Sequence, residues 1–280
     1  MKYIFQRNWF SSVKSLGKQQ LLAETNLIGT EIEAVGRLVI DKSTFVIKEA
    51  GWEVSRSPGG LLNGGRDVPE LIGATAYFNA GGDLRRAVGG EAGGLARELL
   101  AECTRGIIQA ETFLYVERGF GTPENYGAYW EREFLNSCRY YSNLDRISRR
   151  WPEYVGGYCP GTSLYKRAKN CSVFKAAGKT VTSGVFSDSF HEMNVWLEIS
   201  REGTVAECGG SFLRAPDQVC FENAGLLGRL RGLTVSGLSK KQIAGVIGGS
   251  GGCDHLVDLV NDLFRVLENL PGTIGLKMGS

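Results

Sequence analysis

The amino-acid sequence predicts an α+β protein with two tandem units, each with strands first and helices after them. Three observations lead to this class. Blocks of sequence recur in the same order at a separation of roughly 160 residues. Each copy opens with alternating apolar and polar residues, which is the pattern of strands with one buried face. Each copy then continues with segments whose apolar residues have helical spacing.

The recurring blocks define the two copies. They pair SVKSLGK (12–18) with SVFKAAGK (172–179), the segment 31–58 with the segment 192–216, DLRRAVGGEAGG (83–94) with KKQIAGVIGGSGG (240–252), and PGTSLYK (160–166) with PGTIGLK (271–277). A strand-then-helix unit leaves an apolar face uncovered, and a fused duplicate can bury that face. We therefore expect a pseudo-twofold intramolecular dimer, with a degenerate first repeat over residues 1–118 and a second repeat over residues 171–280.

The second copy shows the pattern most clearly. Val195, Leu197 and Ile199 alternate with polar residues before a turn at Glu202 and Gly203, which predicts a β-hairpin. Segments 221–235, 240–247 and 254–267 are separated by Gly or Ser and read as helices. In the last of them, one helical face collects Leu256, Val260, Leu263 and Leu267.

An aromatic-rich insert and a connecting turn occupy residues 119–170, between the two copies. Its apolar residues recur at spacings of three and four, which predicts a helix packed by one face: Trp130, Phe134, Ser137, Tyr141 and Leu144. The favoured interpretation is packing over the domain junction; the alternative is a lid or pocket wall for a planar ligand. An arginine-rich stretch follows, and we interpret it as a solvated helix face in preference to a site for an anionic or aromatic partner: Arg139, Arg146, Arg149 and Arg150.

Composition argues against several classes of protein. The 280 residues are 42% hydrophobic and 22% charged, with a net charge of +2, which gives no field for binding nucleic acid or an anionic membrane. The amino terminus has no continuous apolar segment of the kind a signal peptide needs, and no stretch is long enough to span a membrane. The seven cysteines have no regular spacing, so we expect reduced thiols in a cytoplasmic protein.

The positions at which the copies differ indicate a site. The only two histidines of the chain, His191 and His255, lie in the second copy together with Cys220 and Cys253, and the first copy has no counterparts to them. Cys253 follows a glycine turn and opens a helix, where the helix dipole favours a thiolate.

Two imidazoles and two thiolates form an acceptable tetrahedral zinc site, an iron site or part of an iron–sulfur site. We therefore predict that His191, Cys220, Cys253 and His255 hold zinc or iron, with an iron–sulfur cluster as the alternative. Two further interpretations stay open: packed cysteines with a hydrogen-bonded histidine, and metal-free Cys/His catalysis. In the mechanism that we expect, Asp254 or Asp258 orients an imidazole, and Tyr126 or Tyr129 of the insert exchanges a proton with the substrate.

Several segments together resemble the bacterial family catalogued as domain of unknown function 2889: FQRNWFSSV, HEMNVWLEIS, RAPDQVC, LRGLTVSGLSKKQIAGVIGG and GGCDHLVDLV. Cys220, Cys253 and His255 coincide with the recognisable positions of that family. A fainter similarity is to iron–sulfur scaffold proteins of the NifU and IscU type, with Cys220 and Cys253 standing for two of their cysteines; this is an analogy of fold.

We expect a bacterial enzyme that acts on a small, aromatic molecule at this site with the help of a metal ion. One alternative is a carrier or scaffold protein for a metal or an iron–sulfur cluster. Another is a non-catalytic structural subunit. The expected partner is a small-molecule ligand, with a homo-oligomer or a protein partner as a further expectation and neither nucleic acid nor membrane.

Overall fold

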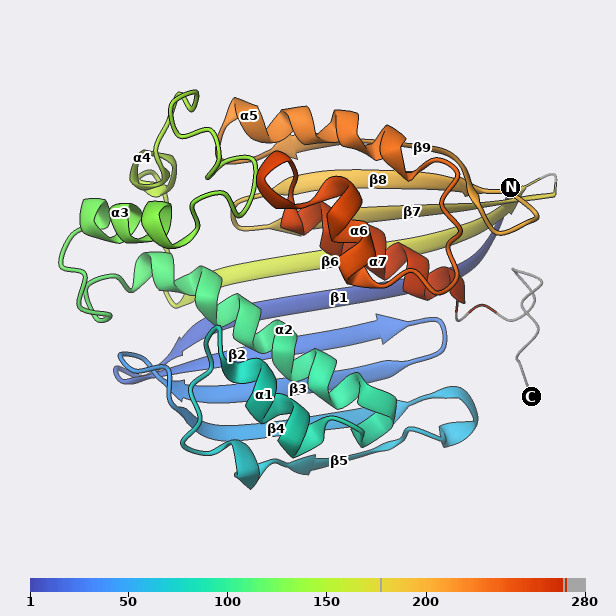
Figure 1. The fold of residues 1–280 in the computed structure, drawn as a ribbon. Helices are drawn as coiled ribbons and strands as arrows, with labels where there is room; N and C mark the ends of the chain where they lie inside the picture. The colour runs from blue at the N-terminus through green and yellow to red at the C-terminus, as the bar shows by residue number, and fades with distance from the viewer. Residues whose placement is uncertain (177, 269, 271–280) are drawn as a thin grey trace. The chain divides into compact units, whose positions relative to one another are not determined.

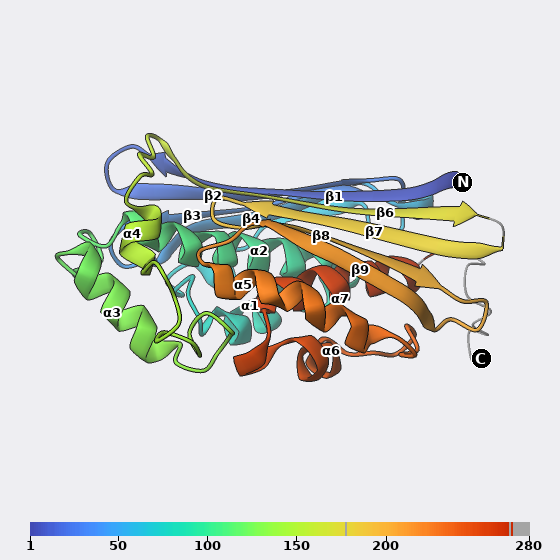
Figure 2. The same ribbon diagram turned by 90° about the horizontal axis from the view of Figure 1, so that it is seen from above.

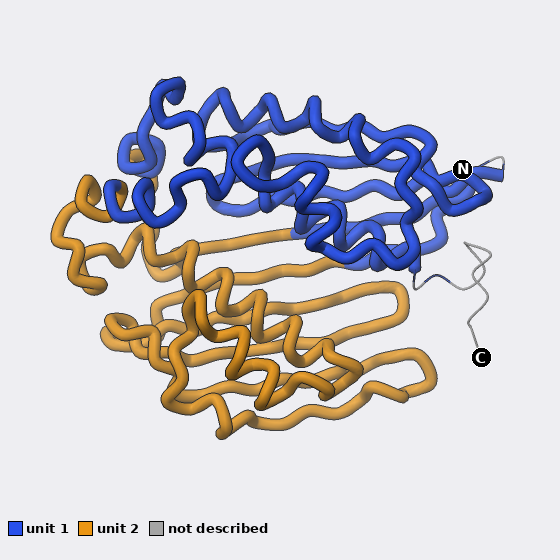
Figure 3. Tube along the Cα trace, in the orientation of Figure 1, with its two compact units in different colours: residues 1–7, 128–155, 169–280 blue, residues 8–127, 156–168 orange. Residues whose placement is uncertain are grey.

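The computed structural model describes residues 1–176, 178–268 and 270, and its chain divides into two compact units. Figure 3 shows unit 1, which comprises residues 1–7, 128–155 and 169–280, and unit 2, which comprises residues 8–127 and 156–168. The sequence predicted boundaries at residues 118 and 170. The units are instead interleaved, because part of the insert belongs to unit 1 and because the first strand of each predicted copy runs from one unit into the other.

Nine strands form a sheet with the hydrogen-bonded order β5-β4-β3-β2-β1-β6-β7-β8-β9 (Figure 1). Their bounds are β1 Lys2–Leu16, β2 Gln20–Gly29, β3 Glu33–Asp41, β4 Ile47–Arg56, β5 Gly64–Asp67, β6 Ser163–Ala176, β7 Lys179–Asp188, β8 Glu192–Ile199 and β9 Val205–Arg214. Buried and less buried residues alternate along β2 and β8, which is the period-two pattern of a sheet with one face in the core.

In unit 2, the strands β2 to β5 pair antiparallel, and the helices α1 (Ala80–Val88) and α2 (Leu95–Ala110) cover one face of them (Figure 1). A glycine in β3 lets α2 approach closely, because a Cβ atom at Gly36 would lie 2.6 Å from Cβ of Leu99. Short 3₁₀ helices complete the unit: η1 Pro58–Gly60, η2 Pro69–Leu71, η3 Glu91–Gly94 and η4 Glu111–Phe113.

In unit 1, the strands β7, β8 and β9 pair antiparallel, and helices lie along one face of them (Figure 2). These helices are α5 (Gln218–Phe221), η5 (Glu222–Leu230), α6 (Lys240–Ile247) and α7 (Asp254–Glu268), with the short turn η6 (Gly249–Gly251) before α7. The core collects side chains from both layers, among them Val195 and Leu197 of β8 and Leu259 and Leu263 of α7, which are all fully buried.

The elements agree with the sequence in several places. The protein is α+β, the β8–β9 hairpin has its turn at Gly203, and α6 has the predicted bounds. All four residues predicted on one face of the last helix are buried: Leu256, Val260, Leu263 and Leu267. The segment predicted as a helix over 221–235 is a 3₁₀ helix that ends at Leu230, and Gly225 and Gly228 within it disfavour an α-helix. The second PGT block, residues 271–277, lies outside the described residues.

The predicted helix of the insert is only partly correct. Two helices lie in this part of the chain, α3 (Pro123–Glu133) and α4 (Trp151–Val155), so α3 ends before most of the predicted face. Asn136 has a left-handed backbone with φ 62°, which terminates helical winding. Trp130 and Phe134 still stack at 4.3 Å between ring centroids, and the ring centroids of Phe134 and Tyr141 are 5.9 Å apart.

The part of the insert in unit 1 is held to that unit by Arg139. Its backbone N–H donates to the carbonyl of Gly252 at 2.8 Å, and its Nη2 donates to the carbonyl of Gly251 at 2.7 Å. Its Nε also donates to Oδ1 of Asn223 at 3.0 Å. These bonds favour the packing interpretation of this segment. Among the described residues, no helix combines the length and apolar character needed to cross a bilayer.

Candidate metal centre

The turn between β7 and β8 carries two of the residues that form the site. Asp188 ends β7 and folds its own carboxylate back onto the turn, where Oδ1 accepts hydrogen bonds from the backbone N–H of Phe190 at 2.8 Å and of His191 at 2.7 Å. Aspartate commonly closes turns in this way. The backbone N–H of Asp188 also donates to the carbonyl of His191 at 2.8 Å. The turn therefore fixes the position of His191 relative to the Asp188 carboxylate.

Two side chains from outside the turn hold its backbone. Arg214, at the end of β9, donates from Nη1 to the carbonyl of Ser189 at 2.7 Å and from Nη2 to the carbonyls of Asp188 at 2.6 Å and His191 at 3.4 Å. The hydroxyl of Tyr154 in α4 donates to the carbonyl of Phe190 at 2.5 Å. We call the segment 188–191 the site loop and Arg214 its clamp.

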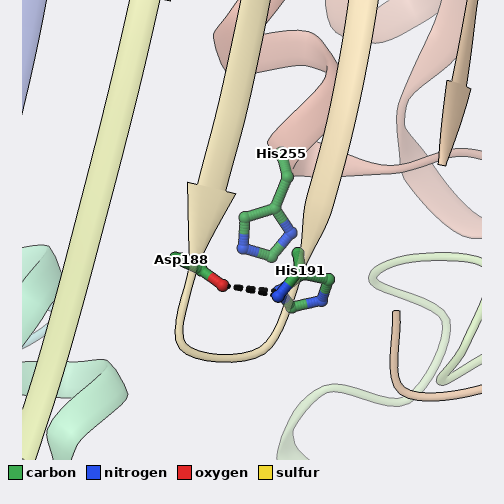
Figure 4. A group of neighbouring side chains, drawn as sticks. All are labelled: Asp188, His191 and His255. Carbon is green, nitrogen blue, oxygen red and sulfur yellow. Dashed lines mark hydrogen bonds and ion pairs between the residues drawn. The ribbon is translucent and has the colours of Figure 1, made fainter. Parts of the chain in front are cut away.

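His255 reaches the site loop from the first turn of α7 (Figure 4). Its ring lies 4.1 Å from the His191 ring between centroids, at an interplanar angle of 32°. It also contacts the Phe186 ring edge-to-face, with 5.2 Å between the ring centroids. His191 and Asp188 are buried, and His255 is half-buried.

These three residues form one group of ligand-type atoms. One such atom from each of Asp188, His191 and His255 lies within 4.8 Å of the others. Nδ1 of His191 is 3.2 Å from Oδ1 of Asp188, so the carboxylate also holds the imidazole in place (Figure 4). Two imidazoles and one carboxylate are a donor set that zinc and non-haem iron both accept, with open positions left for water or substrate.

One comparison with known proteins found a match, and it covers the part of the chain that holds this group. Residues 174–267 match the family described as protein of unknown function (DUF2889). The match contains Asp188, His191 and His255 and begins only within β6, so it supports the family resemblance for the second half of the chain. No curated protein and no solved structure is significantly similar to the chain, and the similarity to NifU and IscU scaffolds is not confirmed.

Of the four metal ligands predicted from the sequence, the structure brings together His191 and His255, and it adds Asp188 to them. Cys220 and Cys253 lie within the matched residues 174–267 but are not part of this group of three ligand-type side chains. Cys220 lies in the short helix α5, and Cys253 immediately precedes α7, as the sequence predicted for a cysteine at a helix start. Both are buried in the core of unit 1, and burial raises the pKa of Cys220 to about 12 and the pKa of Cys253 still further. Burial thus favours the protonated thiol over a thiolate ligand.

The residues predicted to be catalytic lie in different surroundings. Tyr126 belongs to unit 2, where it is buried with its hydroxyl 3.5 Å from Oε2 of Glu111. Tyr129 belongs to unit 1 and contacts Trp130 edge-to-face at 6.4 Å. Asp254 is the first residue of α7 and is exposed. The Asp188 carboxylate contacts the His191 imidazole. Orientation of an imidazole by Asp254 or Asp258, and proton exchange by a tyrosine of the insert, stay predictions.

Asp188 is the site residue that the sequence analysis missed. The segment SDSFH reads as a turn between two strands, and aspartate is common in turns for structural reasons alone. A usable signal was nevertheless present, since Asp188 lies three residues before one of the only two histidines of the chain. A turn of that length brings a carboxylate and an imidazole together.

Proposed function

We propose that this protein binds one divalent metal ion at Asp188, His191 and His255 and uses it to transform a small molecule. The observation that supports the proposal is the convergence of the three side chains, whose ligand-type atoms lie within 4.8 Å of one another. The backbone that carries them is held by the clamp and by α7 without any metal ion, so little ordering is needed on binding.

The equivalent loop of unit 2 serves as an internal comparison. There the backbone N–H of Gly29 donates to the carbonyl of Ile32 at 2.8 Å, as Asp188 does to His191. Arg56 donates from Nη1 to the carbonyl of Thr30 at 3.0 Å and from Nη2 to the carbonyls of Gly29 at 2.8 Å and Ile32 at 3.4 Å. This is the hydrogen-bond pattern of Arg214.

The loop of unit 2 thus has the turn and the arginine that holds it, but not the ligand set of unit 1. At one constant separation along the chain, Gly29, Ile32 and Ala96 stand where unit 1 has Asp188, His191 and His255. The fold therefore forms this turn without a polar side chain at those three positions; the carboxylate of the unit 2 loop, Glu31, stands where unit 1 has Phe190. That comparison favours a chemical role for the three polar side chains over a purely structural one.

We also infer that the two halves arose by duplication. The β3–β4 pairing has register shifts at Glu33/Ala34 and Val39/Ile40, and the β8–β9 pairing has them at Glu192/Met193 and Glu198/Ile199. Each shift in the β3–β4 pairing has a counterpart in the β8–β9 pairing. The separation along the chain between the two is the same as that between the two loops. Irregularities in strand pairing that recur at matching positions support a common origin, because regular strands do not require them.

The donor set favours a single ion over an iron–sulfur cluster, since the group contains two imidazoles and a carboxylate but no thiol. Zinc and iron remain the proposed cofactors. A bound ion of this kind polarises a substrate oxygen or lowers the pKa of a bound water. The chain itself would orient the ligands: the Asp188 carboxylate fixes the His191 ring, and the edge of the Phe186 ring packs against His255.

The test is metal titration of chelator-treated protein with Zn²⁺ and Co²⁺, followed by elemental analysis. We expect about one equivalent per chain in the wild type, and a loss of most of the affinity in His191→Ala, His255→Ala and Asp188→Ala. The matched controls are Cys220→Ser and Cys253→Ser, which change the two thiols that lie outside the group and should retain the metal. Full metal binding by the histidine variants would overturn the proposal, and loss of metal in the cysteine variants would favour the Cys/His set instead.

A second candidate, metal-free acid–base catalysis, is favoured by one contact. Nδ1 of His191 lies 3.2 Å from Oδ1 of Asp188, the arrangement of a carboxylate that orients a general base. It predicts activity that withstands chelators but not His191→Ala. A metal carrier needs an exposed site, and the burial of Asp188 and His191 argues against that alternative.

A further inference from the structure

A pocket of about 340 Å³ lies beside the site loop in unit 1, between the insert, the end of β9 and the start of α5. Its volume lies near the lower limit of small-molecule sites, roughly 300–1,000 Å³. Two of its lining residues, Arg214 and Tyr154, are those that hydrogen-bond to the carbonyls of the site loop. These two side chains therefore connect the pocket to the backbone of the site loop.

The charge in this pocket is not balanced by its own residues. Asp217 contributes a carboxylate, but its Oδ2 accepts hydrogen bonds from the backbone N–H and the hydroxyl of Ser148 at 2.8 and 2.7 Å. Its Oδ1 accepts from the backbone N–H of Val219 and caps α5. Although burial opposes ionisation, these hydrogen bonds hold the pKa of Asp217 below its usual range. The carboxylate is thus committed to joining the insert to α5.

The pocket is lined by two arginines, Arg214 and Arg149. Arg214 holds the site loop, whereas Arg149 makes few contacts. It is exposed, it donates from Nη2 to the carbonyl of Pro216 at 3.2 Å, and its guanidinium lies over the Tyr154 ring at 4.6 Å. It forms no ion pair with any residue that the structure describes. Stacking on an aromatic ring orients a guanidinium while leaving its edge available for a planar anion.

The remaining walls combine apolar and aromatic surface with the polar side chains of Ser148 and Gln218. Tyr154, Phe221 and Leu213 line the pocket, and Leu213 is 65% exposed. A planar apolar body with one carboxylate matches a single oriented guanidinium beside such walls, since arginine binds carboxylates through two parallel hydrogen bonds.

We infer that this pocket binds an organic acid with an aromatic or apolar body, and that Arg149 binds its carboxylate. This inference rests on the proposed function in one respect: the pocket is then the substrate subsite beside the metal centre. The occupant is identified by its chemistry, a monocarboxylate on a planar apolar body.

The probe is benzoate, titrated against chelator-treated protein and followed by saturation-transfer NMR. Benzamide, which has the same shape without the charge, and inorganic phosphate, which has the charge without the apolar body, serve as comparisons. We expect saturable benzoate binding in the millimolar range and binding of both comparison compounds at least about tenfold weaker. Arg149→Gln should weaken benzoate binding about tenfold or more, since it removes a charge-assisted pair.

The matched control is Arg132→Gln. Arg132 also belongs to unit 1, is exposed and lies over a tyrosine ring, that of Tyr129 at 5.6 Å, but it does not line the pocket. Benzoate affinity should be unchanged in this variant. No saturable binding up to about 10 mM, equal binding by Arg149→Gln, or equal binding of phosphate would each overturn the inference.

Because the probe is titrated without metal, failure of the two proposals can be told apart. If only the metal proposal is wrong, benzoate should still bind and its affinity should still depend on Arg149. If only the pocket inference is wrong, benzoate should not bind through Arg149, but His191→Ala and His255→Ala should still weaken metal binding.

Discussion

Replacing the clamp of the site loop should weaken metal binding although Arg214 is not itself a ligand. Its guanidinium donates three hydrogen bonds to carbonyls of the loop, at 2.7, 2.6 and 3.4 Å. Each hydrogen bond from a charged donor contributes about 1.5–3 kcal/mol. In an Arg214→Gln variant, water replaces some of these hydrogen bonds to the carbonyls. We therefore expect the ordered conformation of the loop to be destabilised by about 2 kcal/mol relative to its open conformations.

That loss converts into affinity through the fraction of molecules whose loop is ordered. A cost of about 2 kcal/mol lowers the ratio of ordered to open loops about 30-fold, and the apparent metal dissociation constant rises by up to the same factor. The assay is a competition titration of Zn²⁺ against a chromogenic chelator, with urea unfolding measured in parallel.

Arg56→Gln is the matched control, because Arg56 makes the same three bonds to a loop that lacks counterparts of Asp188 and His191. It should reduce the stability of the protein by a similar amount, about 2 kcal/mol, and leave metal affinity unchanged. The reasoning is refuted if Arg214→Gln keeps the wild-type affinity, or if Arg56→Gln weakens metal binding to the same extent.

Three further predictions concern residues outside the metal centre. Glu111→Gln should lower the free energy of unfolding by about 3 kcal/mol, because it leaves the partly buried Arg118 without its carboxylate, while metal content stays the same; an unchanged urea midpoint would contradict this. Iodoacetamide at mildly alkaline pH should label the exposed Cys159 well before Cys253, whose thiol pKa is raised by burial; mass spectrometry of the peptides would reveal equal rates if this is wrong. Asp217→Asn should cost about 1–3 kcal/mol at neutral pH. Since the folded-state pKa of Asp217 lies below its ordinary value of 3.8, this difference should be complete above that pH and shrink as the pH falls further; a constant gap in urea titrations would oppose it.

Much of the fold follows from local patterns. Alternation along Val195, Leu197 and Ile199 predicts a strand with one buried face, and these side chains are buried. The apolar spacing of the last helix predicts its buried stripe for the same reason. The insert shows the limit of such reasoning: its aromatic spacing continues beyond Glu133, but the left-handed backbone at Asn136 ends the winding, and asparagine at that position does not by itself predict this conformation.

The site was predictable in part. The two histidines could be found because they are the only ones in the chain and lie in one half of it. Cys220 and Cys253 were chosen by residue type, and type alone does not distinguish a ligand from a small apolar side chain in a core. Asp188 could not be predicted without the geometry of the turn. Its carboxylate lies close to His191 because it accepts a hydrogen bond from the backbone of the site loop.

The two loops of this chain separate what the fold requires from what the chemistry requires. Both turns are held by an arginine at the end of the following hairpin, Arg56 or Arg214, so the clamp belongs to the fold. Only one turn carries a carboxylate and an imidazole, and only there does the facing helix supply a second imidazole. Burying these polar groups costs free energy that Ile32 and Ala96 avoid in the other half. A fold that forms the same turn without that cost has no structural need for the three polar residues, and this is the argument for the metal ion that we propose at them.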